Sequence, residues 1–153
     1  MRAMKKKSPA MTLIPAIKCC LSNSYLIFLK TQNYHWHVTG PHFHALHLLF
    51  ESQYNELFEA NDVIAEHLRA LNEFAPATLS EFKADSMIKE GVSSDGWRDM
   101  VKVLFSDHEQ LIMLYNEALV LAEDDGDAAS ADLITDRLRA HKKHAWMLKS
   151  TLD

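Results

Sequence analysis

Only four glycines and four prolines interrupt this 153-residue sequence, so few positions force the chain to turn. Apolar residues make up 48% of the chain and recur at three- and four-residue steps through four long stretches, the spacing of amphipathic helices. We find no internal repeat and no linker to a second domain. The sequence predicts an all-α fold, a four-helix bundle over residues 15–153 preceded by a flexible basic arm over residues 1–14.

Turn signals divide the bundle into its predicted helices. The first covers about 15–37, and the second, about 42–71, has the clearest apolar stripe. The third follows Asp95, a possible N-cap, and ends at the acidic turn 123–127, and the fourth covers about 128–152. A short amphipathic piece at about 79–88 predicts an extra helix in the long connection between the second and third helices. Trp97 and Trp146 are predicted core residues.

Charge and cysteine content limit the compartment and the partners. Net charge is −5, which argues against a chain built mainly to coat nucleic acid. Cys19 and Cys20 are adjacent and cannot join distant segments, which favours a reducing, cytoplasmic compartment. Pro15 and Lys18 interrupt the apolar region that a secretory signal would need, and no run approaches the roughly 18 apolar residues of a membrane span. We expect a protein that stays where it is made and has no membrane partner.

One stripe of the second helix carries residues suited to metal chemistry. It begins at His47 and continues at three- and four-residue steps. Such a stripe beside an apolar face is either a solvated flank or a set of ligands. Imidazole with carboxylate and no thiolate suits Fe, Mn or Zn. The later members of the stripe are Glu51, Asn55, Phe58, Asp62 and Glu66. Three nearby histidines, His37, His42 and His44, are interpreted as ordinary polar residues at helix ends.

Distance decides how such a site could be completed. His47 and Asp62 are fifteen residues apart, roughly 22 Å along one helix, so they cannot hold the same metal. An antiparallel hairpin brings His35 level with His47, whereas Asp62 and Glu66 form a separate half-site. No Glu-x-x-His motif is present to complete a site within one chain. The sequence therefore predicts two identical sites shared between two subunits related by a two-fold axis.

The run from His35 through Trp36 to His47 resembles the His-Trp-x-Val-x-Gly-x-x-Phe-x-x-Leu-His signature of the Dps proteins, which are ferritin-like. Residues 62–66 resemble the family's Asp-x-x-Ala-Glu. The resemblance implies a ferritin-like bundle whose ferroxidase ligands are His35 and His47 of one subunit and Asp62 and Glu66 of its neighbour, with Trp36 beside the site. Glu51 is a fifth candidate ligand, although many members have Asp at that position. His67 also departs from the family, which usually has Arg there, and is predicted to be a minor surface position.

The same resemblance implies a hollow dodecamer, built from two-fold dimers, that takes in Fe(II) and stores ferric mineral. Two irons would occupy each site, where Zn or Mn could also bind, and hydrogen peroxide would be preferred to dioxygen as the oxidant. Acidic residues in the positions of the family's three-fold entry pores are Glu123, Asp127 and Asp132, although an acidic helix start is also favourable for the helix dipole alone.

Two other functions stay open. A nucleoid-associated, DNA-compacting protein would use the basic arm repeated on every subunit, whose charges are Arg2, Lys5, Lys6 and Lys7. Alternatively, the arm is only a solubilising terminus. A bundle that stores or senses a metal without turnover would use the same ligands as the ferroxidase and differ only in activity.

Overall fold

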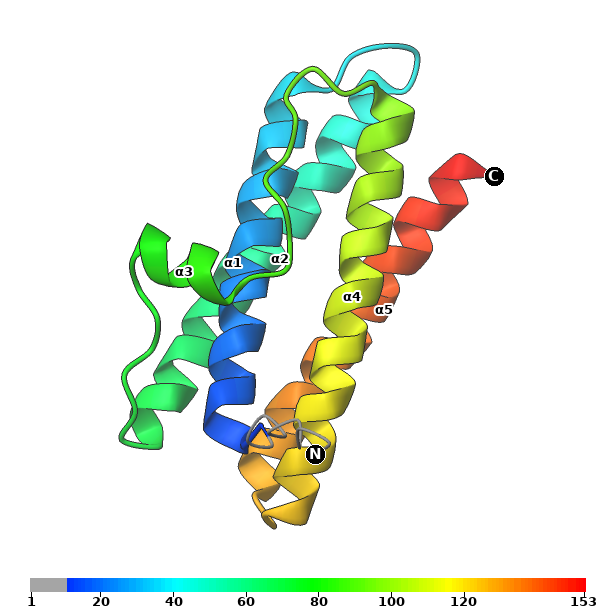
Figure 1. Ribbon diagram of the computed structural model, residues 1–153. Coiled ribbons are helices and arrows are strands. Elements are labelled where there is room, and N and C mark those ends of the chain that lie inside the picture. The colour runs from blue at the N-terminus through cyan, green and yellow to red at the C-terminus, as the bar shows by residue number, and fades with distance from the viewer. Residues whose placement is uncertain (1–10) are drawn as a thin grey trace, which may run out of the picture.

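A computed structural model describes residues 11–153, so the basic residues of the predicted arm lie outside the described residues and the arm stays a prediction. Within this range the chain forms α-helices and no strand. The helices are α1 (Leu13–His37), α2 (Phe43–Ala70), α3 (Leu79–Asp85), α4 (Trp97–Asp124) and α5 (Ala128–Leu152) (Figure 1). The predicted all-α bundle with a short extra helix in the long connection is confirmed.

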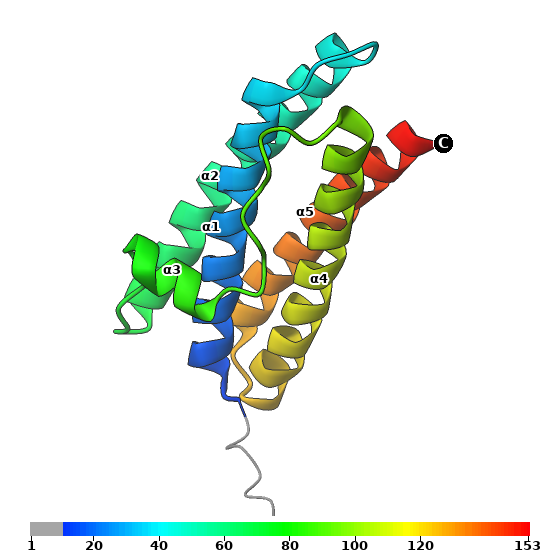
Figure 2. The same cartoon turned by 45° about the horizontal axis from the view of Figure 1, so that its top comes forward.

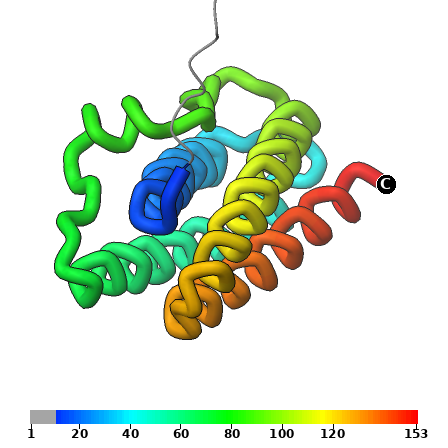
Figure 3. Tube along the Cα trace, turned by 60° about the horizontal axis from the view of Figure 1, so that its bottom comes forward, coloured from blue at the N-terminus to red at the C-terminus, as the bar shows by residue number. Residues whose placement is uncertain are grey.

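The four long helices form two antiparallel hairpins, α1 with α2 and α4 with α5 (Figure 1). The connection between the hairpins runs back along the bundle and carries α3, which packs against α1 (Figure 2). Seen nearly end-on, this connection wraps around the outer side of α1 (Figure 3). The two hairpins meet mainly through α1 and α4, and to a much smaller extent through α2 and α5. The smaller joint, between α2 and α5, contains polar side chains that bond to one another.

The apolar stripes that the sequence predicts face the bundle interior. Phe50, Leu57, Ile64 and Leu68 of α2 are fully or nearly fully buried, and so are their counterparts on α4, including Leu104. Burial of this kind contributes about 25 cal/mol for each Å² of apolar surface removed from water. By length and composition α1 would also qualify as a membrane span, contrary to the expectation from the sequence. More than half of its qualifying window is buried inside the bundle, as a core helix would be.

Several helix ends differ from the sequence prediction. Gly96, not Asp95, is the N-cap of α4, and Asp95 instead accepts a hydrogen bond from the Tyr34 hydroxyl at 3.0 Å. The short helix ends at Asp85 and begins with a capping box made by Thr78 and Glu81.

Trp97 packs partly buried against the core as predicted. The core prediction for Trp146 was wrong, because this side chain is 65% exposed on α5.

Candidate metal half-sites on α1 and α2

The turn between α1 and α2 brings two histidines face to face. The imidazoles of His35 and His47 stack with centroids 3.8 Å apart and an interplanar angle of 17°. Gly40 makes this tight turn possible with a φ of +102°, a conformation that strains any residue with a Cβ atom. The hairpin register predicted from the sequence is thus present in the structure.

Each imidazole is held by the backbone of the other residue. Nδ1 of His35 lies 2.7 Å from the carbonyl oxygen of His47, and Nδ1 of His47 lies 2.8 Å from that of His35. A carbonyl oxygen only accepts, so both Nδ1 atoms must donate. In the neutral ring the lone pair is then on Nε2. Within residues 11–153 neither Nε2 has a hydrogen-bond partner, which leaves two neutral nitrogen donors oriented by the fold.

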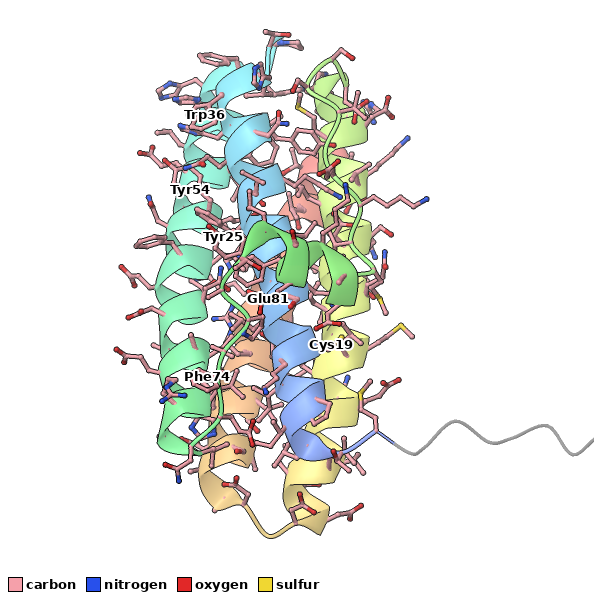
Figure 4. All side chains as sticks on the ribbon, turned by 60° about the vertical axis from the view of Figure 1, so that its left-hand side comes forward. Cys19, Tyr25, Trp36, Tyr54, Phe74 and Glu81 are labelled. Carbon is pink, nitrogen blue, oxygen red and sulfur yellow. The ribbon has the colours of Figure 1, made fainter. Side chains whose placement is uncertain are left out.

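Aromatic rings surround this histidine pair. Tyr54, one helical turn beyond Glu51 in the direction of Asp62, stands edge-on to His35 with ring centroids 5.2 Å apart. Phe43 lies 5.1 Å from the ring of His47. Trp36, which follows His35 in the chain, is 61% exposed, and Figure 4 places it at one end of the bundle, above Tyr54 and Tyr25. The sequence prediction named Trp36 as the aromatic beside the site and missed Tyr54.

The carboxylates of the stripe are not near the histidine pair, with one exception. Glu51 is half-buried one helical turn after His47, so it lies beside the histidines. Asp62 and Glu66 are exposed near the other end of α2. In the described part of a single chain, no three histidine, cysteine, aspartate or glutamate side chains gather as a metal site. The separation of His47 from Asp62 along α2 thus agrees with the helical rise.

A groove borders the carboxylate half. It has a volume of about 660 Å³ and lies between α1, α2 and the segment that leads into α3. Its walls are mostly apolar and include Tyr25, Phe58 and Phe82, and Asp62 lies at its edge. Phe58 is 64% exposed, and Val63 beside Asp62 is also exposed. Apolar side chains that face outward around an acidic pair indicate a surface suited to packing against another protein.

The remaining histidines of this region have ordinary roles, as interpreted from the sequence. His42 precedes α2 and packs edge-on against Trp97 with centroids 4.5 Å apart. His37 bonds its own helix through the carbonyl of Asn33 at 2.8 Å. His44 is exposed and makes no hydrogen bond in the described part of the chain.

His67 is not the minor surface position that the sequence suggested. Its Nε2 lies 2.7 Å from the hydroxyl of Ser130, a fully buried residue near the start of α5. The Ser130 hydroxyl donates in turn to Asp127 at 2.7 Å, so Nε2 of His67 is the donor of the first bond. This chain of bonds ties the last turns of α2 to the first turn of α5.

The three predicted pore residues have different surroundings. Glu123 and Asp132 are exposed. Asp127 is the N-cap of α5, and its carboxylate accepts bonds from the backbone N–H and the hydroxyl of Ser130. These two bonds hold the pKa of Asp127 below its ordinary value. Asp127 therefore has a structural role that the sequence did not reveal.

The fold and the half-sites together define a ferritin-like protein. The family model of the ferritin-like domain matches residues 16–153. Among solved structures, Dps from Thermosynechococcus elongatus superposes with a TM-score of 0.89 at 29% identity, covering 92% of this chain and 90% of that one. A Dps protein from Vibrio cholerae O1, described as a member of a broad superfamily of ferritin-like diiron-carboxylate proteins, superposes with a TM-score of 0.88 at 28% identity, over 95% and 100% of the two chains.

Curated relatives give the same assignment. DNA protection during starvation protein 2 of Bacillus anthracis is 32% identical over 128 residues, which cover 84% of this chain and 88% of that protein. The chain belongs to the Dps family of ferritin-like proteins.

Proposed function

We propose that this protein is a ferroxidase that oxidises Fe(II) and stores the product inside a homo-oligomer. The observation that supports this most directly is the histidine pair, His35 and His47, whose Nε2 atoms are oriented by the backbone and free of partners in the described chain. Membership of the Dps family and the similarity to a ferritin-like diiron-carboxylate protein support iron as the substrate. Asp62 and Glu66 of a partner subunit would complete the site.

Geometry supports a two-fold arrangement for this completion. Two antiparallel copies of α2 would place the histidine end of each copy against the carboxylate end of the other. The outward apolar residues of α2, among them Phe58 and Val63, would then be covered by the partner. Each pair of subunits would contain two identical sites. A dodecamer built from six such pairs would enclose the space in which ferric mineral is stored.

The residues of the site would bind and orient Fe(II). His35 and His47 offer neutral nitrogen, and Asp62 and Glu51 offer single carboxylate oxygens. Glu66 is the residue best suited to bridge two ions. Two Fe(II) ions held together can give two electrons to one hydrogen peroxide, which with two protons yields two Fe(III) and two waters. A one-electron step, which would release a hydroxyl radical, is avoided. Tyr54 covers one edge of His35, and Trp36 would lie beside the site.

The test is to add Fe(II) without oxygen, then peroxide or air, and to follow ferric absorbance. Oxidation by peroxide should be faster than by air, and both faster than for free Fe(II) in buffer. Replacing His35 and His47 together by alanine should slow oxidation by about 100-fold, because both nitrogen ligands are lost. His44→Ala is the matched control and should keep the wild-type rate. A wild-type rate equal to that of free Fe(II) would contradict the proposal and, if Fe(II) still binds, would favour storage or sensing without turnover.

Iron entry and location complete the proposal. Glu123 and Asp132 are exposed carboxylates, and three copies around an axis would attract cations towards a pore. Asp127 would contribute its charge while it caps α5. Zn or Mn could occupy the same ligands. The vicinal cysteines are free, Cys20 buried and Cys19 half-buried, which is compatible with the reducing cytoplasm that we propose as the location.

DNA binding is the second candidate function. It is supported by the four basic residues of the first seven, Arg2, Lys5, Lys6 and Lys7, and by the name of the Bacillus anthracis relative. Twelve copies of a weak phosphate contact would act together. Deletion of residues 1–7 should abolish gel retardation of duplex DNA, and wild-type binding should weaken steeply with salt. Unchanged retardation by the deleted protein would place the contact on another surface, and no retardation by the intact protein would exclude this function.

A further inference from the structure

The joint between α2 and α5 is built from buried polar side chains. Both oxygens of Glu56 on α2 accept hydrogen bonds from Arg137 on α5, and one of them also accepts from Nε2 of His144 at 2.8 Å. Gln53 of α2 donates to the backbone carbonyl of His144 at 3.4 Å. Arg137 and His144 are both less than a tenth exposed. We call the group formed by Glu56, Arg137 and His144 the polar seam.

Behind the polar seam lies a fully buried pair of histidines. Nδ1 of His108 on α4 lies 2.9 Å from Nδ1 of His141 on α5, and neither residue is exposed. Only one of two facing nitrogens can carry the proton of this bond. Nη2 of Arg137 donates to Nε2 of His141 at 3.4 Å, so the proton of His141 is on Nδ1 and His108 accepts. His108 therefore carries its own proton on Nε2, which is buried without a partner.

This arrangement leaves no position for an additional proton. A proton added to Nδ1 of His108 would face the N–H of His141. A proton added to Nε2 of His141 would face the guanidinium of Arg137. In both cases two donors meet in a buried space, and a bond becomes a repulsion. The closed arrangement therefore requires both histidines to be neutral.

The charged neighbours do not relieve this constraint. From α2, the carboxylate of Glu56 faces the cluster, but Arg137 and His144 already occupy it. From α4, the neutral ring of Tyr115 stacks on His141 at 5.2 Å. From α1, Cys20 and Ser24 approach Tyr115, and both are uncharged in their ordinary state. From α5, the ring of His144 lies 5.1 Å from that of His108, and positive charge on His144 or Arg137 disfavours a further proton on the pair.

We propose that the His108–His141 pair makes the polar seam an acid-opened lock between the two helical hairpins. Both histidines belong to the α4–α5 hairpin, and the link to α2 runs through Arg137, which bonds His141 and Glu56. A proton on Nε2 of His141 repels Arg137 and so weakens the contact of α5 with α2, while the apolar contact of α1 with α4 persists. Because α2 also carries Asp62 and Glu66, opening would disturb the carboxylate half-site. That last consequence rests on the proposed function, whereas the lock itself does not.

The direction of the pH effect follows from linkage. Burial, together with the nearby positive charges, holds the pKa of His108 and of His141 well below the ordinary histidine value. The open state regains that ordinary value of about 6.5, so it binds more protons than the closed state below this pH. Between pH 6.5 and 5.5 the opening equilibrium constant should therefore rise about 5-fold for each histidine, or about 30-fold for the pair, because a histidine in the open state is already half protonated at pH 6.5.

A second titration in the polar seam occurs in a different pH range. Burial alone would raise the pKa of Glu56, but the bonds from His144 and Arg137 outweigh it and lower the pKa to about 2. Because this pKa is depressed, the stability that Glu56 provides is lost only as the pH falls below its ordinary value of about 4.5. Measurements between pH 6.5 and 5.5 thus report the histidines alone.

Hydrogen–deuterium exchange of the full-length oligomer at pH 6.5 and 5.5 tests the lock, with rates corrected for the pH dependence of intrinsic amide exchange. Exchange in residues 53–57 and 137–145 should accelerate by about 30-fold at the lower pH, whereas residues 17–27 of α1 should change much less. His108→Leu with His141→Leu should remove this acid response. His44→Gln, which replaces an exposed histidine, should retain the wild-type response.

A single variant keeps the proposal testable if the double variant fails to fold. In His108→Gln the amide oxygen can still accept from His141, and one titrating group is gone, so the acceleration should fall to about 5-fold. The proposal is wrong if wild-type exchange accelerates equally in α1 and in the polar seam, or does not accelerate at all. An acid response that persists unchanged in folded His108→Gln would also overturn it. None of these outcomes depends on whether the protein oxidises iron.

Discussion

Two inactive variants should recover Fe(II) oxidation when they are assembled together. One variant lacks the imidazoles, His35→Ala with His47→Ala, and the other lacks the carboxylates, Asp62→Ala with Glu66→Ala. Each forms only damaged sites by itself. In a mixed two-fold pair one site inherits both defects, and the other combines intact histidines with intact carboxylates. Pure mixed pairs should therefore reach about half of the wild-type activity, and random pairing about a quarter, because half of the pairs are mixed.

The controls separate shared sites from other causes of recovery. Each variant, unfolded and reassembled alone, should stay inactive. Co-assembly of the imidazole-deficient variant with a His47→Ala protein should also stay inactive, since both damage the same half-site. Different affinity tags on the two chains verify that mixed oligomers form. If verified mixed oligomers show no recovery, each site is contained in one chain and the geometry inferred from α2 does not apply.

The sequence predicted the features that depend on helical spacing. Positions of His35 and His47 follow from two helices and a short turn, and the separation of His47 from Asp62 follows from the rise of a single helix. Helix α5 begins and ends where its pattern predicts, at Ala128 and Leu152. These features are local, so they need no knowledge of which helices pack together.

The features that the sequence did not reveal depend on contacts between distant segments. His67 was predicted to be a surface residue, but in the folded chain it bonds to Ser130 of α5. Glu56 has the spacing of an ordinary flank residue, and only the packing of α2 on α5 brings Arg137 to it. Trp146 was predicted to be a core residue yet faces outward in the single chain. Sequence periodicity identifies the buried face of a helix but not the partner that contacts it.

Bonding between backbone and side chain was equally hidden. The reciprocal bonds from the two Nδ1 atoms to the carbonyls of His47 and His35 fix which nitrogen of each ring is free. No residue pattern encodes that choice, because every residue offers the same carbonyl oxygen. The candidate ligands could therefore be named from sequence, but their protonation and direction required the structure.

Substituting one member of a buried ion pair between α1 and α4 should lower the free energy of unfolding strongly. Nζ of Lys30 lies 2.6 Å from Oδ2 of Asp107, and their side chains are only 2% and 7% exposed. Burial raises the pKa of the Asp107 carboxyl even though the bond from Lys30 lowers it, so removal from water outweighs the attraction. Burial therefore offsets much of the attraction within the pair, and each charge needs the other.

Asp107→Ala should lower the free energy of unfolding by about 3–5 kcal/mol, because it leaves the ammonium of Lys30 buried without its partner. Lys30→Met combined with Asp107→Leu should recover most of that loss, since it removes both charges and keeps the space filled. Urea unfolding of the three proteins measures these differences. Asp99→Ala, at an exposed position in the first turn of α4, is the matched control and should change stability by less than about 1 kcal/mol. If the double variant were as unstable as Asp107→Ala, the ion pair would contribute net stability, and the balance between burial and attraction inferred from the pKa of Asp107 would be reversed.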